Sequence, residues 1–426
     1  GISALMVLLT GIVMFAGVIV SWNIGPRNKD FFILYFLLIA GVFGVFVSLD
    51  LFFFFFFYEL AVLPMYLLIG IWGSSSDFRI FVRTKEYSAM KLMLYLVAGS
   101  VLIWIALVAI FAKADLGTFN YVAIMNGTSF SPEFQRFVFP LLMVGFGVLA
   151  GMWPFHTWSP DGHVAAPTAV SMVHAGVLMK LGAYGILRVG IGLFPSGAED
   201  WIPVLIGLGT VNVIYGAISA MGQRDLKYVV GYSSVSHMGF VTLGVYAWNE
   251  LALQGAVITM LAHGLSAAAL FMLAGGLQHR IHTRNMEDMG GFWAKVPRMS
   301  AVALFFSIAA LGMPGFGNFI GEFLALLGAF QSNVPLTVLS ALGLIFAAVY
   351  SLWVIQKVFH GEYAGKNFDN RDFTDLNRRE MAYFGAMIIG LLWMGIYPQS
   401  FLDLSAGALN DLLSNSENLV AIVGEN

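Results

Sequence analysis

Apolar segments long enough to cross a bilayer follow one another along almost the whole chain. A helix needs about 20 apolar residues, at roughly 1.5 Å of rise each, to cross the hydrocarbon core. Such segments are expected at residues 2–22, 31–48, 51–72, 91–111, 137–153, 169–189, 201–221, 228–247, 251–277, 297–330, 336–359 and 381–397. The sequence therefore predicts an all-α polytopic membrane protein with about 12 crossings.

The composition agrees with this class and excludes others. Of 426 residues, 59% are hydrophobic and 11% are charged, and the mean hydropathy is +0.83, whereas a soluble domain carries about 25% charged residues. A net charge of −3 provides no basic face for phosphates, so no nucleic-acid partner is expected. Cysteine is absent, which excludes disulfides, thiolate metal sites and cysteine-ligated iron–sulfur clusters within this chain.

The chain starts inside an apolar segment, with Gly1-Ile2-Ser3 and no initiator methionine. The charged region and small-residue cleavage site of a signal peptide are missing. We therefore expect an incomplete N-terminus and no secretory leader.

Helix-breaking prolines interrupt the chain at two of the predicted crossings. Pro154 and Pro160 directly follow the apolar part of the fifth crossing, and Pro314 lies in a glycine-rich stretch of the tenth. Irregular backbone at membrane depth survives only where it is buried in protein or lines a wet cavity. An offset of five helices predicts two inverted repeats, about 31–190 and 201–359, within one transmembrane domain covering 1–426.

The distribution of loop cations predicts an orientation. If 297–330 is one broken crossing, alternate loops carry 17 Lys and Arg residues, and the opposite loops carry only Lys113, Arg136 and Arg188. If 297–330 were two separate crossings, the cations of the last loop would lie on the side that otherwise carries few Lys and Arg residues. The positive-inside rule therefore favours one crossing, with the first residue outside and the charged loops in the cytoplasm.

Isolated ionisable residues lie inside the apolar segments. A charge at membrane depth costs several kcal/mol, so Glu59, Lys180 and Glu322 mark either a path for protons or ions, or internally paired structural charges. His237 and His263 also lie inside predicted crossings. A histidine can relay a proton through both ring nitrogens, but a buried one can also simply pack.

Several motifs resemble the antiporter-like proton-channel subunits of respiratory complex I. They are Phe56-Phe57-Tyr58-Glu59-Leu60, Pro154-Phe155-His156-Thr157-Trp158, Pro160-Asp161-Gly162-His163, Ala166-Pro167-Thr168, Ala175-Gly176-Val177-Leu178-Met179-Lys180, Tyr232-Ser233, Ser236-His237-Met238-Gly239, Ala262-His263-Gly264 and Gly312-Met313-Pro314-Gly315-Phe316-Gly317-Asn318 to Glu322. The resemblance extends over about 31–398. Within this group, the motif around Glu322 is most similar to subunit M, the counterpart of mitochondrial chain 4.

This resemblance implies proton translocation driven by NADH:quinone oxidoreduction elsewhere in a complex. It implies that this chain binds no NADH, FMN, iron–sulfur cluster, quinone or metal, because those groups belong to other subunits. The expected partners are other membrane-arm subunits and the lipid bilayer, and the expected location is the bacterial inner membrane. The family has fourteen helices, which implies that two precede Gly1.

The resemblance also implies roles for individual residues. The implied proton path consists of Glu59, Lys180, His237, His263 and Glu322, of which the two histidines join two half-channels through water. Auxiliary candidates are Lys91, His156, His174 and Lys227.

One position departs from the family pattern. The family's lysine on the first broken helix falls on Leu149, and no residue from 137 to 155 is ionisable. Glu59 therefore lacks its usual partner, and burial favours its neutral form unless Lys180, Lys91 or water reaches it. His174 lies six residues before Lys180 and could face the same cavity, or could be a packing histidine.

Three alternatives stay open. The chain could be a subunit of a multisubunit cation/proton antiporter or a pump module of a membrane-bound hydrogenase. It could also be a scaffold without a transport role, for which Leu149 is the main argument.

Overall fold

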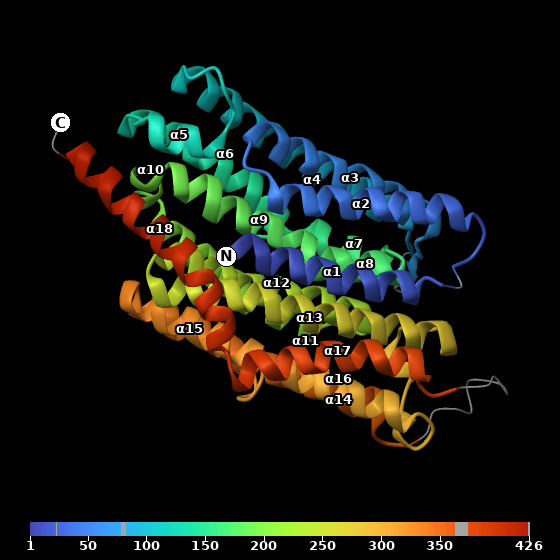
Figure 1. Cartoon of the computed structure of the whole chain (residues 1–426). Coiled ribbons are helices and arrows are strands. Elements are labelled where there is room, and N and C mark those ends of the chain that lie inside the picture. The colour runs from blue at the N-terminus through green and yellow to red at the C-terminus, as the bar shows by residue number, and fades with distance from the viewer. Residues whose placement is uncertain (23, 78–81, 363–373, 425–426) are drawn as a thin grey trace.

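Long helices run side by side through the computed structural model (Figure 1). The structure describes residues 1–22, 24–77, 82–362 and 374–424, with side chains as far as residue 414. The first ten helices are α1 (Ile2–Val20), α2 (Asn28–Val47), α3 (Leu51–Trp72), α4 (Lys85–Ala114), α5 (Tyr121–Gly127), α6 (Pro132–Ala150), α7 (Trp158–Ala165), α8 (Thr168–Val173), α9 (Met179–Gly185) and α10 (Pro195–Glu199). The others are α11 (Ile202–Met221), α12 (Leu226–Ala247), α13 (Glu250–Ile281), α14 (Pro297–Ala310), α15 (Gly317–Ser332), α16 (Val334–Val354), α17 (Arg378–Ile396) and α18 (Gln399–Gly424).

Shorter elements connect these helices. Two-residue strands β1 (Ser76–Asp77) and β2 (Val82–Arg83) pair antiparallel. π-helical turns join α8 to α9 and extend α9 and α16, and they are η2 (His174–Leu178), η3 (Ile186–Ile191) and η6 (Ile355–Phe359). The 3₁₀ turns are η1 (Phe155–Thr157), η4 (Met286–Asp288) and η5 (Phe292–Ala294).

The predicted class is confirmed. Among the described residues, 10 helical segments are long and apolar enough to cross a membrane. The two remaining predicted crossings correspond to α12 and to the pair α14 and α15. Helix α18 was not predicted, because its sequence mixes polar and apolar residues. Three loop cations used to predict the orientation, Arg79, Lys366 and Arg371, lie outside the described residues.

Side-chain caps fix where several helices begin. The Asp50 carboxylate accepts from the N–H groups of Phe52 and Phe53 at the start of α3. Asp225 caps α12 in the same way. Each aspartate also forms an isolated antiparallel bridge to an asparagine, Asp50 to Asn120 and Asp225 to Asn285. A cap satisfies backbone donors that have no partner within the helix.

The two predicted breaks are present, but one of the three proline predictions is wrong. Helix α6 ends before Pro154, and Pro314 lies between α14 and α15. Pro160, in contrast, lies inside α7 and does not interrupt it. Pro160 occupies the first turn of that helix, where an N–H group has no intrahelical acceptor, so the missing donor costs little.

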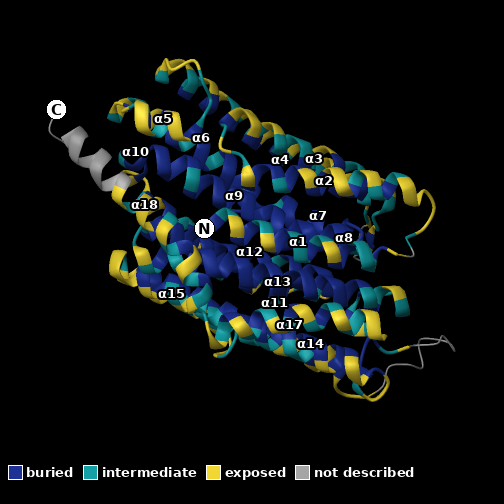
Figure 2. Cartoon of the chain, in the orientation of Figure 1, coloured by how far each residue is buried: buried dark blue, intermediate teal, exposed yellow. Residues whose placement is uncertain are grey.

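The most buried helices lie at the centre of the bundle. The apolar window of the segment Thr168–Ile191 is 100% buried and that of α13 is 94% buried, whereas that of α17 is 22% buried. Figure 2 shows this contrast, with buried residues gathered on α7 to α9, α12 and α13 and exposed residues on the outer helices. The exposed apolar side chains of the outer helices suit contact with lipid. Polar groups on the central helices are therefore enclosed in protein.

Candidate functional site: a buried line of ionisable side chains

Four of the five residues of the predicted path form one line at the centre of the protein. Nζ of Lys180, on α9, lies 2.8 Å from Nδ1 of His263, on α13. The ring centroids of His263 and His237, on α12, are 5.0 Å apart. Nδ1 of His237 lies 2.6 Å from Oε1 of Glu322, on α15. Each of these side chains is at most 2% exposed, so the line is enclosed.

Hydroxyl groups occupy the remaining ring nitrogens of the two histidines. Nε2 of His263 lies 3.2 Å from Oγ of Ser234. Nε2 of His237 lies 3.2 Å from the hydroxyl of Tyr350, on α16. An imidazole with a partner at each nitrogen can take a proton at one and release it at the other. The geometry of both rings therefore suits proton transfer.

A π-helical turn precedes Lys180. Its Nζ donates to the carbonyl of Ala175, within η2, at 2.5 Å. A π turn widens the helix and leaves carbonyl groups displaced from the regular ladder, and such turns are frequent at functional sites. The segment that carries Lys180 thus also supplies an acceptor for its amine.

Two glycines make room for Glu322. A Cβ atom on Gly321 would lie 2.6 Å from the backbone nitrogen of Thr259, so α15 packs directly against the backbone of α13. Gly312, in the break before α15, has φ +77°, and a Cβ there would lie 3.0 Å from Oε2 of Glu322. That oxygen is buried and has no hydrogen-bond partner within the described part of the chain. The break therefore places flexible backbone beside the free oxygen of the carboxylate.

Glu59 does not join this line. Its Oε1 is buried without a hydrogen-bond partner, and no ion pair to it occurs among the described residues. Ser100, on α4, lies beside it, but the Ser100 hydroxyl donates to the carbonyl of Val97 at 3.0 Å. The amines of Lys91 and Lys180 bind other partners. Among the described residues, Glu59 therefore has no cationic partner.

A second polar cluster lies around Asp161, which the sequence analysis did not select. Its carboxylate accepts from Lys91 at 2.9 Å and from the Tyr228 hydroxyl at 2.9 Å, and it also binds Arg83. Asp161 is 3% exposed, whereas the side chains of Lys91 and Arg83 are 19% and 27% exposed. Asp161 lies two residues before His163 in the same motif. A carboxylate so close to a histidine in a predicted membrane segment could have marked it as a candidate.

The other auxiliary candidates lie near this cluster or near Lys180. His156 is buried, neither of its ring nitrogens has a partner, and its ring lies 4.9 Å from that of Tyr215. Nζ of Lys227 donates to the carbonyl of Ala166 at 3.3 Å. His174 is buried within η2, six residues before Lys180.

An ion pair lies at the N-terminal end of α12. The Asp225 carboxylate lies 3.0 Å from Nε of Arg284. Burial raises the pKa of the Asp225 carboxyl above its ordinary value, and the Arg284 charge opposes that shift. Arg284 also donates to the carbonyl of Val164 and to Ser76, so it ties α12 to α7 and to β1.

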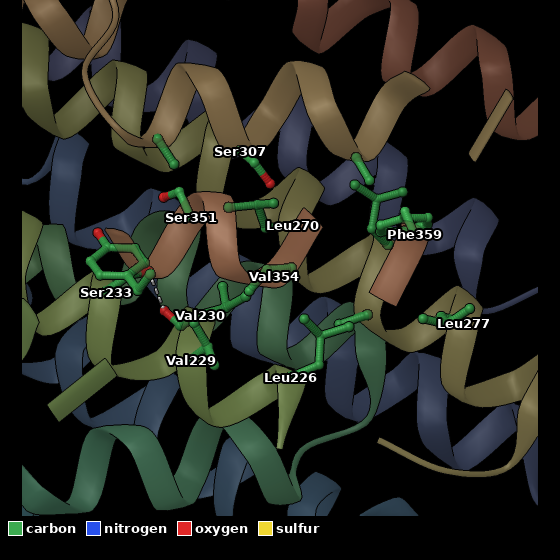
Figure 3. A pocket seen from close by; sticks show the side chains of 15 residues that line it. Leu226, Val229, Val230, Ser233, Leu270, Leu277, Ser307, Ser351, Val354 and Phe359 are labelled. Atoms are coloured by element: carbon green, nitrogen blue, oxygen red, sulfur yellow. Dashed lines mark hydrogen bonds between the residues drawn. The ribbon is translucent and has the colours of Figure 1, made fainter. Parts of the chain in front are cut away.

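A small cavity lies between α12, α13, α14 and α16. Its volume is about 40 Å³, which is room for roughly two or three water molecules. Ser307 and Ser351 line it together with apolar residues of α12, including Val229 and Val230 (Figure 3). Tyr350 also lines the cavity and binds His237 directly. The cavity therefore adjoins Tyr350, the hydroxyl partner of His237 in the buried line.

Within the described residues, no three His, Cys, Asp or Glu side chains form a group that could hold a metal ion. The buried line itself consists of amine, imidazole and carboxyl groups, which can all take part in acid–base chemistry.

Comparisons with known proteins place this arrangement in context. Residues 48–348 match the family model described as "NADH:quinone oxidoreductase/Mrp antiporter, TM". The chain is 42% identical over 415 residues to NADH-quinone oxidoreductase subunit M of Pseudomonas aeruginosa, covering 96% of this chain and 80% of that protein. A chain of respiratory complex I from Thermus thermophilus superimposes with a TM-score of 0.88 at 27% identity, covering 99% of this chain and 85% of that chain. A chain of the Mrp complex from Dietzia sp. gives 0.83 at 19% identity, covering 99% of this chain and 85% of that chain, which shows a shared fold.

Proposed function

The chain belongs to the NADH:quinone oxidoreductase/Mrp antiporter transmembrane family, and from this membership we propose that it is a proton-translocating membrane-arm subunit of an NADH:quinone oxidoreductase. In such a complex, NADH, FMN, iron–sulfur clusters and quinone would bind to other subunits, and this chain would move protons without a redox group of its own. Its partners would be the neighbouring membrane-arm subunits and the surrounding lipid.

The observation that carries the proposal is the line from Lys180 through His263 and His237 to Glu322. The lysine ammonium gives a proton to Nδ1 of His263 across 2.8 Å, and His237 gives one to Glu322 across 2.6 Å. The step between the two imidazoles has no direct hydrogen bond, and water would relay it. Every group in the line can bind and release a proton. A proton could therefore cross the buried centre while always bound to a polar group and never exposed to lipid.

The cavity beside Tyr350 lies between the buried line and one membrane surface. Its lining includes Leu226, at the loop end of α12, and Phe359, at the end of η6. The loops at these ends carry cations, and the positive-inside rule assigns them to the cytoplasm. We therefore propose that this cavity lies on the cytoplasmic side of the buried line, in a bacterial inner membrane.

We propose that residues 31–190 and 201–359 are inverted repeats. Helix α2 packs on α3 as α11 packs on α12, and α4 packs on the broken pair α6 and α7 as α13 packs on α14 and α15. The aspartate caps of α3 and α12 and their bridges to Asn120 and Asn285 add a local match. Inverted repeats would supply the two half-channels that meet at the central histidines.

Three other functions remain as alternatives. The first two are a cation/proton antiporter subunit and a pump module of a membrane-bound hydrogenase. The Mrp chain shares the fold, and the 42% identity to subunit M favours the complex I assignment over the 19% match to that chain. A scaffold without transport is disfavoured by the enclosed line itself. Burying an amine and a carboxyl costs several kcal/mol each, and apolar side chains would avoid that cost.

A substitution of Lys180 tests the proposal. Lys180→Met removes the amine and keeps much of the side-chain volume, so the complete complex should assemble and oxidise NADH while its proton pumping in liposomes falls strongly. Lys113→Met, at an exposed lysine near the end of α4, is the matched control. Pumping at the wild-type rate by Lys180→Met would contradict the proposed path.

A further inference from the structure

Two buried histidines lie outside the line described above. His163, on α7, and His174, in η2, are both fully buried. Their ring centroids are 3.9 Å apart with an angle of 41° between the planes. Trp158 stacks on His174 at 5.1 Å and Phe271 lies 5.2 Å from His163, so aromatic rings enclose the pair.

Three of the four ring nitrogens of the pair have no hydrogen-bond partner among the described residues. They are Nδ1 of His163 and both nitrogens of His174. The fourth, Nε2 of His163, lies 3.0 Å from the hydroxyl of Ser159. A buried polar atom without a partner costs about 1 to 3 kcal/mol. If the two side chains served only to pack, phenylalanine would fill a similar space without leaving buried nitrogen atoms unpaired.

The backbone is shaped around this pair. A Cβ atom on Gly162 would lie 3.1 Å from Cε1 of His174, so the glycine lets the imidazole approach α7 closely. The hydroxyl of Ser171 donates to the carbonyl of His163 at 2.7 Å and holds α7 against α8. Both elements that carry the histidines are therefore fixed relative to each other.

Charged and titratable groups face the pair from several elements. His174 precedes Lys180 by six residues in the consecutive turns η2 and α9, and the Ser159 hydroxyl contacts both His163 and Met179, the residue before Lys180. Asp161 precedes His163 by two residues on α7 and connects to the partly exposed Lys91. The pair thus lies near the buried line and near a polar cluster that reaches toward solvent.

We propose that His163 and His174 form a proton-donating pair that charges Lys180, in place of an ionisable residue on the broken helix α6. One imidazolium gives its N–H proton, directly or through water, to the neutral lysine amine, which leaves a neutral imidazole and an ammonium. Because two imidazolium rings 3.9 Å apart would repel each other, the pair carries at most one positive charge, that is, one proton more than two neutral imidazoles. The proposal rests on the proton-translocating function inferred above.

The experiment compares three variants of the complete complex reconstituted in liposomes. His174→Gln keeps a side chain that can form hydrogen bonds but cannot carry a proton in this way, and it should lower the rate of NADH-driven proton pumping by roughly tenfold, which is about 1.4 kcal/mol on the barrier. His163→Gln should lower the rate similarly. Phe271→Leu alters the packing around the pair without removing a nitrogen and should pump normally, and native electrophoresis shows whether each complex is assembled.

The outcomes separate this inference from the proposed function. If Lys180→Met stops pumping but both glutamine variants pump at the wild-type rate, the histidine pair is structural and this inference fails alone. An equal loss in Phe271→Leu would also overturn it, because packing would then explain the effect. If Lys180→Met pumps normally, the proposed path itself fails.

Discussion

Replacing Glu322 with glutamine separates proton transfer from hydrogen bonding. The carboxylate binds Nδ1 of His237 at 2.6 Å through Oε1, and an amide oxygen can accept the same bond. A hydrogen bond to a charged group contributes about 1.5 to 3 kcal/mol and a neutral one about 0.5 to 1.5 kcal/mol. The substitution should therefore cost about 1 to 2 kcal/mol of stability, which is small beside the roughly 5 to 15 kcal/mol of a folded domain.

The effect on transport should be much larger than the effect on stability. A glutamine amide does not take up and release a proton near neutral pH, so the buried line would end at His237. We expect Glu322→Gln to assemble and to abolish proton pumping, measured with a pH-sensitive dye in liposomes during NADH oxidation. Glu250→Gln makes the same chemical change at an exposed position and is the control.

Two results would refute this reasoning. Wild-type pumping by Glu322→Gln would show that protons do not need this carboxyl group. Loss of the assembled complex would show that Glu322 is a structural charge whose contribution exceeds the difference between a charged and a neutral hydrogen bond. Glu322→Asp keeps the carboxyl group on a side chain one methylene shorter, and it should retain part of the pumping if the first interpretation is correct.

Two further predictions concern Glu59 and Gly312. Glu59→Gln should keep more than half of wild-type pumping, because Glu59 has no ion pair among the described residues, and complete loss of pumping would instead indicate an obligatory charged partner. Gly312→Ala should lower both the thermal stability of the complex and its pumping, because the left-handed backbone at φ +77° costs about 1 to 2 kcal/mol with a Cβ atom and that atom would lie 3.0 Å from Glu322. Gly207→Ala, where nothing lies within 4 Å of the added atom, is its control, and equal behaviour of the two variants would contradict the argument.

The sequence predicted the crossings well because apolar length is a local property. The segment 51–72 coincides with α3, and most other predicted segments differ from their helices by a few residues at each end. The failure at Pro160 has a different origin. A proline is disruptive in a helix interior and harmless in the first turn, and the sequence did not show that α7 restarts at Trp158.

The candidate site could be predicted as a set of residues but not as an arrangement. Charge inside an apolar segment identified Glu59, Lys180 and Glu322 one by one. The contact between Lys180 and His263 joins residues 83 positions apart, and the contact between His237 and Glu322 joins residues 85 apart. Such pairings depend on how whole helices pack, which hydropathy along the chain does not encode. Asp161 was not predicted as a site residue for the same reason, because its partners come from other segments that packing brings to it. They are Arg83, Lys91 and Tyr228.

The position of Leu149 gains a physical meaning from this arrangement. A path that received protons through an ionisable residue on α6 would be interrupted here, because Leu149 is fully buried and apolar. Lys180 nevertheless keeps a proton acceptor in His263 and two titratable rings beside it. Lys180, His263, His237 and Glu322 thus all keep ionisable side chains, and the proposed replacement concerns only the supply of protons to Lys180. His163 belongs to a motif that resembles the family and His174 does not, so His174 is the residue by which this chain would differ in how Lys180 receives its proton.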